Sequence, residues 1–177
     1  MLQNYPDSKR KDSISAGLEF QDFVIVECYK IGIILMNFSS KKYQYNKGEG
    51  LSPYEIKLDE WCSKTYRLSI EFAERTAINK PWVKSGIDIE NNSIFYIQGN
   101  HDIFFCFTKK MLRKLHNLRK KDGSKKFEDK EEDTIKTFYL PFKYCKEYCA
   151  FYIDPKDGSI HTNSLPFNEE MPLFAQK

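Results

Sequence analysis

The chain has 177 residues, 41% hydrophobic and 15% aromatic, which is enough to bury one sizeable core and excludes a wholly disordered polypeptide. Its formal net charge of +3 is too small to indicate a polyanionic partner by itself. No apolar run approaches about eighteen residues and the N-terminus is polar, so we expect neither membrane insertion nor secretion. The cysteines form no CxxC pair, as is typical of reduced thiols in a cytoplasmic protein.

The first third of the chain predicts a helix followed by a buried strand. Residues 1–13 are polar, and we expect them to form a flexible arm before a single domain that spans 14–177. Over 15–31, apolar side chains recur with helical spacing, and Gly32 ends the predicted helix. The run IILMNF at 33–38 is almost continuously apolar, which predicts a buried strand.

Two alternating runs follow, at 51–59 and 66–73. Each alternates apolar and polar residues with period two, so we expect a β-hairpin joined through EWCSKT. In such a hairpin one face is apolar and the other is densely charged. The charged face would carry Glu55, Lys57, Asp59, Arg67, Ser69 and Glu71.

The second half predicts more strands and one basic helix. Residues 93–98 and 103–107 are expected to be strands around a turn, and 109–121 a helix with a Leu-rich side. The charged segment at about 120–133 is expected to be an exposed loop, and the aromatic segment after it to be strand-like. The three histidines share no motif and are expected at the surface. This order predicts an α+β or mixed α/β fold.

Four acid-x-Lys triplets occur in the chain, and one stands apart from the others. Only Glu55-Ile56-Lys57 lies in a strand-like run with an apolar central residue, and only this triplet follows another carboxylate, Glu49, in a Gly-flanked turn. Residues two apart on a strand point to the same face, so Glu55 and Lys57 are expected side by side. Carboxylates are the ligands that Mg²⁺ prefers, and a nearby ammonium can orient water and offset developing negative charge.

A helix with an acid, a buried strand, an acid and then Glu-x-Lys in a hairpin resembles the PD-(D/E)xK nuclease superfamily, which includes many restriction endonucleases. The resemblance covers roughly residues 15–75, with Glu55 and Lys57 matching the (D/E)xK half. Glu49 stands where the family has its upstream acid. Glu19 corresponds to the helical glutamate that some branches use.

The resemblance implies a restriction-endonuclease-like core, a central mixed β-sheet flanked by helices, and Mg²⁺- or Mn²⁺-dependent hydrolysis of DNA. Glu49 and Glu55, with the main-chain carbonyl of Ile56, would hold the metal ion, and Lys57 would orient the attacking water. Glu19 would be an additional metal ligand and Glu71 a reserve one. The family resembled often dimerises, which allows a homodimer.

Two further interpretations stay open. The charged residues of the predicted hairpin can be ordinary cross-strand ion pairs, and the same fold can be a non-catalytic module that binds nucleic acid or protein. The basic helix is the better candidate for contact with DNA phosphates. Its candidate residues are Lys109, Lys110, Arg113, Lys114, Arg119 and Lys120.

Overall fold

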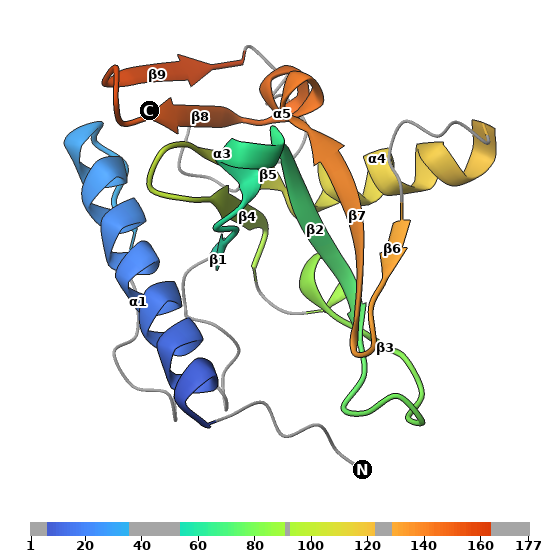
Figure 1. Cartoon of the computed structure of the whole chain (residues 1–177). Coiled ribbons are helices and arrows are strands. Elements are labelled where there is room, and N and C mark those ends of the chain that lie inside the picture. Colours follow the sequence, from blue (N-terminus) through green and yellow to red (C-terminus); the bar gives the residue numbers. More distant parts are fainter. Residues whose placement is uncertain (1–6, 36–53, 91–92, 123–128, 164–177) are drawn as a thin grey trace.

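The computed structural model describes residues 7–35, 54–90, 93–122 and 129–163 (Figure 1). Its helices are α1 (Asp7–Lys30), α3 (Cys62–Thr65), the 3-10 helix η1 (Gly86–Asp88), α4 (Lys109–Asp122) and α5 (Phe142–Tyr148). Its strands are β1 (Tyr54–Leu58), β2 (Arg67–Glu74), β3 (Val83–Lys84), β4 (Phe95–Gly99), β5 (Phe104–Thr108), β6 (Asp129–Glu131), β7 (Ile135–Pro141), β8 (Phe151–Asp154) and β9 (Ser159–Thr162). No helix of these described ranges is long and apolar enough to cross a membrane.

The strands form two sheets, so the mixed α/β class expected from the sequence is confirmed. A five-stranded sheet has the order β1-β4-β5-β8-β9, and a four-stranded sheet has the order β3-β2-β7-β6. The first sheet is mixed, because β1 runs parallel to β4 and the remaining neighbours are antiparallel. In Figure 1, α1 covers one side of the five-stranded sheet, and the four-stranded sheet and α4 lie on its other side.

Helix α1 packs through one stripe and ends where the sequence predicts. Phe20, Val24 and Cys28 are fully buried in a cluster with residues of the five-stranded sheet. At the C-terminus, Gly32 has a positive φ of 82°, and its N–H donates to the carbonyl of Tyr29 at 3.0 Å. This is the backbone conformation that glycine adopts without strain, and it closes the last turn of the helix.

The arm expected over residues 1–13 is helical in its described part, because α1 begins at Asp7. Neither Gly nor Pro occurs between Asp7 and Ser13, and an acid at the first turn suits the helix dipole. The strand expected over 33–38 is also absent from its described part. Residues 33–35 form no strand and Ile34 is 73% exposed, while 36–38 lie outside the described residues.

The hairpin expected between 51–59 and 66–73 is wrong in its pairing. Both strands exist over the described residues, but β1 pairs with β4 in one sheet and β2 pairs with β3 and β7 in the other. The connection forms α3 instead of a tight turn, and Tyr66 after it has a left-handed φ of 53°. Residues 51–53 lie outside the described residues. Alternation locates a strand and its faces, but it does not say which strand lies next to it.

The second half follows the prediction more closely. The β4–β5 hairpin and helix α4 are confirmed, with Leu112 and Leu115 of α4 buried in the core between the sheets. The charged loop expected over 120–133 is shorter, because α4 continues to Asp122 and β6 begins at Asp129. Residues 123–128 lie outside the described residues.

Two predictions for this half are wrong, one for His116 and one for the aromatic segment after β7. His116 is buried, with its ring stacked on Phe138 at a centroid distance of 4.8 Å, because it lies on the same side of α4 as Leu112. Helix α5 interrupts the aromatic segment expected to be strand-like, and its Cys145 is buried. Pro141 just before the helix is the sequence signal for this start.

Gly86 in η1 allows the chain to pass directly against β2. Its φ is +47°, and a Cβ added there would lie 2.2 Å from the main-chain oxygen of Glu71. Two backbones therefore meet where no side chain fits. This close approach positions η1 beside the site described below.

We expect Gly86→Ala to lower the free energy of unfolding by about 1–3 kcal/mol more than Gly158→Ala, because it adds overpacking to the backbone strain that both share. Gly158 is a matched control, since its φ is +64° and an added Cβ would meet nothing within 4 Å. Its own cost is about 1–2 kcal/mol for a left-handed backbone. Urea unfolding of both variants measures the difference. Equal stabilities would contradict the close approach at Gly86.

Candidate functional site

Strand β1 presents Glu55 and Lys57 together on one face. Ile56 between them belongs to the cluster that packs on α1, and its register partner Ile97 on β4 belongs to the same cluster. Glu55 and Lys57 therefore point to the opposite side of the sheet, and Lys57 Nζ lies 3.2 Å from Glu55 Oε1. The prediction that these two side chains share a face is confirmed.

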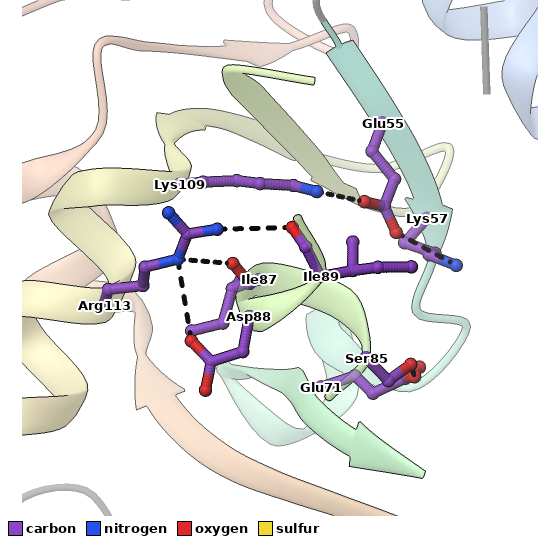
Figure 2. Close-up of polar contacts among 9 residues, drawn as sticks. All are labelled: Glu55, Lys57, Glu71, Ser85, Ile87, Asp88, Ile89, Lys109 and Arg113. Carbon is purple, nitrogen blue, oxygen red and sulfur yellow. Dashed lines mark hydrogen bonds and ion pairs between the residues drawn. The ribbon is translucent and has the colours of Figure 1, made fainter. Parts of the chain in front are cut away.

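The Glu55 carboxylate is removed from water and held by a second ammonium group. Lys109, the first residue of α4, places Nζ 2.8 Å from Glu55 Oε2, and the two side chains are only 2% and 4% exposed (Figure 2). Glu55 Oε2 accepts no hydrogen bond from the described residues, so this contact is an ion pair without a directed hydrogen bond. Lys57 is 36% exposed, so one of the two ammonium groups reaches solvent.

Arg113 fixes the opposite wall of the site. Its Nε donates to the carbonyl of Ile87 at 2.7 Å, and its Nη2 lies 3.4 Å from the carbonyl of Ile89. Arg113 Nε is also 3.6 Å from the Asp88 carboxylate. In Figure 2, Lys109 and Arg113 extend from adjacent turns of α4, one toward β1 and the other toward η1. One helix therefore holds both neighbouring elements.

The basic helix divides into an inward and an outward set. Lys109 and Arg113 are engaged with protein partners, whereas Lys110 and Lys114 are exposed. The side chains of Arg119 and Lys120 lie outside the described residues. Lys109 was predicted to contact DNA, but its side chain is buried against Glu55.

The other predicted ligands are separate from Glu55 or outside the described residues. Glu71 on β2 accepts a hydrogen bond from the Ser85 hydroxyl. Glu19 lies on α1, on the far side of β1, where Ser15 Oγ donates to it at 3.4 Å. Glu49 belongs to the segment 36–53, which is not described. The structure therefore brings together Glu55 and Lys57 of the predicted set.

Lys109 is the site residue for which sequence reasoning chose the wrong role. It follows β5 directly and starts a helix in which Leu112 and His116 are buried at positions i+3 and i+7. That spacing places Lys109 on the inward stripe of α4. A cation on a buried stripe is a signal for a buried acidic partner, because an isolated buried charge is strongly unfavourable.

A divalent metal ion at this site would need several oxygen ligands close together. Glu55 offers a carboxylate, which is the right kind of ligand for Mg²⁺, but the Lys109 ammonium lies 2.8 Å from its Oε2. No group of three His, Cys, Asp or Glu side chains within 7–35, 54–90, 93–122 and 129–163 is arranged to hold a metal ion. The described residues therefore fit a divalent ion in the kind of ligand but not in the number.

Comparison with known proteins identifies no relative of this chain. No family model, no curated protein and no solved structure matches this chain. The resemblance to PD-(D/E)xK nucleases therefore rests on the chain's own residues.

Asp59 ends the charged face of β1 and connects the two sheets. Its Oδ2 accepts the Ser69 main-chain N–H of β2 at 2.8 Å, and Gln98 Nε2 of β4 lies 3.5 Å away. Burial raises the pKa of Asp59 above its usual range, and the hydrogen bonds from main-chain N–H groups, Ser69 first, oppose that shift. Asp59 and Ser69 are thus neighbours although their strands belong to different sheets.

We expect the two lysines to couple differently to Glu55 in double-mutant cycles. Lys109→Met with Glu55→Gln should give a coupling energy of about 1–3 kcal/mol, because both charges are buried. Lys57→Met with the same Glu55→Gln should give less than about 1 kcal/mol, because Lys57 is half-exposed. Urea unfolding measures both cycles. A larger coupling for Lys57 would contradict the assignment of Lys109 as the main counter-ion.

We expect Asp59→Asn and Asp102→Asn to change the pH dependence of stability in opposite directions. The folded pKa of Asp59 is raised, so its contribution is present below its unfolded pKa of about 3.9 and is lost as pH rises through the folded value. The hydrogen bond from Lys156 lowers the pKa of Asp102, so its contribution is present above the unfolded pKa and is lost as pH falls.

Unfolding measured at a series of pH values, each variant against the parent chain, tests both signs. The advantage of the parent over Asp59→Asn should shrink with rising pH, and its advantage over Asp102→Asn should grow. The same slope for both variants would rule out burial as the dominant influence on Asp59.

Proposed function

We propose that the chain is a metal-dependent DNA endonuclease with Glu55 and Lys57 at its active site, on a restriction-endonuclease-like core. The observation that carries the proposal is the buried Glu55 carboxylate, flanked on the same strand by the half-exposed Lys57 and from the other side by Lys109. A carboxylate that can bind a metal ion and an ammonium that reaches solvent are two groups that metal-dependent phosphodiester hydrolysis can use.

Each side chain has a distinct role in this proposal. Glu55 and Glu49, with the Ile56 main-chain carbonyl, would hold Mg²⁺ or Mn²⁺, and the proposal therefore requires Glu49 to add its carboxylate to that of Glu55. When bound, such an ion acts as a Lewis acid on a phosphate oxygen. Lys57 orients the attacking water from the solvent side. Lys109 fixes the Glu55 carboxylate and keeps positive charge close to the phosphate.

The outward side of α4 offers a route for DNA. Lys110 and Lys114 are exposed on the helix whose first residue reaches Glu55, so phosphate contacts there would lie beside the site. Such contacts make binding strongly dependent on salt. The proposal includes a cytoplasmic location, and it allows the chain to act on DNA either as a monomer or as a homodimer.

One observation favours a second function, a non-catalytic module that binds nucleic acid or protein. Two ammonium groups already surround Glu55, and the described residues hold no group of three His, Cys, Asp or Glu side chains arranged for a metal ion. A site of this kind can persist as a structural ion pair after catalysis is lost. Such a module would bind DNA equally well in EDTA and after Lys57→Ala.

We expect the full chain to nick or cleave plasmid DNA in Mg²⁺ or Mn²⁺, and Lys57→Ala and Glu55→Gln to reduce the rate about 100-fold or more. Lys156→Ala is the matched control, because Lys156 belongs to another acid-x-Lys triplet but lies in an exposed turn with Asp102 as its ion-pair partner. The measurement is the rate of supercoil loss on an agarose gel.

Two results would count against the enzyme. Cleavage that survives Glu55→Gln would show that another site, or a contaminant, does the chemistry. A parent chain that is inert on supercoiled, linear and single-stranded DNA, yet binds it in EDTA with a steep salt dependence, would support the binding module instead.

A further inference from the structure

A cavity opens at the end of β1, next to the Glu55–Lys57 pair. Its volume is about 340 Å³, within the range of roughly 300–1,000 Å³ that small-ligand sites occupy. The walls come from α1, the end of β1 and the residues after it, β2 and β4. The lining residues are Ser13, Leu58, Asp59, Glu60, Trp61, Ser69 and Gln98.

Gln98 lies in the wall of this cavity and carries a buried hydrogen-bond acceptor that the described protein groups do not satisfy. The side chain is 4% exposed, and its Nε2 donates to the carbonyl of Ser69 at 2.8 Å. Its Oε1 accepts no hydrogen bond from the described residues. A buried acceptor without a donor is unfavourable, so a turn of the amide that brings Oε1 to the cavity would let an N–H group of a ligand complete this hydrogen bond.

The rest of the lining selects for a ligand that donates hydrogen bonds and is flat. Asp59 and Glu60 add carboxylates to the wall, so acceptors predominate over donors. Trp61 is 62% exposed, and Lys64 Nζ lies 4.5 Å from the centroid of its ring. An exposed indole is a surface on which a nucleic-acid base stacks. Acceptors beside an aromatic surface match the N–H-bearing edge of a base.

The strand register places the cavity within reach of the proposed active site. Lys57 on β1 pairs with Gln98 on β4, so their side chains lie next to each other on one face. Neighbouring strands are about 4.8 Å apart, and residues two apart on a strand about 7 Å. A base in the cavity and its own phosphate at Glu55 and Lys57 are therefore separated by about the length of one nucleotide.

We propose that this cavity holds an unpaired base, with guanine preferred, of the DNA strand whose phosphate lies at Glu55 and Lys57. Guanine presents two adjacent N–H donors, N1–H and N2–H, to Gln98 Oε1 and the Glu60 carboxylate, while its ring stacks on Trp61. The inference rests on the proposed nuclease function and specifies its substrate. A base stacked within a duplex cannot enter the cavity, so the substrate is single-stranded DNA or a duplex with an unpaired nucleotide.

Fluorescence of the full chain in EDTA tests the base site separately from catalysis. The chain has two tryptophans, so Trp82→Phe leaves Trp61 as the single indole. Titration with a short single-stranded oligonucleotide that contains one guanine should quench Trp61, and the matched duplex should bind at least about tenfold more weakly. Replacing that guanine by inosine, which lacks the N2 amine, should weaken binding by about tenfold.

Anisotropy of the labelled oligonucleotide compares variants under the same conditions. Trp61→Ala should raise the Kd about tenfold, whereas the control Trp82→Phe should leave it unchanged. Gln98→Met should remove the preference for guanine over inosine; because Gln98 is buried, a thermal unfolding curve checks that this variant folds. Free dGMP should bind more weakly than the oligonucleotide, and equal binding would assign the cavity to free nucleotides and overturn the link to DNA.

The outcomes separate this inference from the proposed function. An unchanged Kd in Trp61→Ala, or equal affinity for single strand and duplex, overturns the base site even if plasmid cleavage is observed. Base-dependent quenching without any metal-dependent cleavage overturns the enzyme and leaves the base site in place.

Discussion

A carboxylate removed from water must be held by positive charge, and in this chain Lys109, at the start of α4, does so for Glu55 on β1. The contact joins the edge strand β1 to the first residue of α4, with 2.8 Å between Lys109 Nζ and Glu55 Oε2. An unpaired charge at either position would be strongly unfavourable, so the two elements must be placed together. This ion pair sets where the start of α4 lies relative to β1, and with it the shape of the candidate site.

Other contacts extend from it. Arg113, one turn further along α4, binds the carbonyls of Ile87 and Ile89, so η1 is fixed by the same helix. Gly86 lets η1 pass against β2 without a side chain between them. On the other side of β1, Ile56 packs on α1. The alternation of Ile56 with Glu55 and Lys57 thus separates an apolar layer from a charged site.

Local patterns in the sequence predicted the elements well and their neighbours poorly. Alternation in β1 placed Glu55 and Lys57 on one face, and Gly32 marked the end of α1, because both features depend on residues a few positions apart. Pairing of β1 with β4 depends on residues distant in the chain, and a short helical connection with Tyr66 in a left-handed conformation sent β2 into the other sheet. The role of Lys109 was missed for the same reason, since a charged residue was read as exposed without knowledge of its partner on β1.

Helix α4 carries its inward and outward basic residues on the same two turns. Lys109 contacts Glu55 on β1, and Arg113 donates to the carbonyl of Ile87 in η1. Lys110 and Lys114 are exposed on the same continuous helix, Lys109–Asp122. Residues four apart on an α-helix are separated by about 6 Å along its axis. A partner bound at Lys110 and Lys114 would therefore lie within about one helical turn of Lys109, the counter-ion of Glu55.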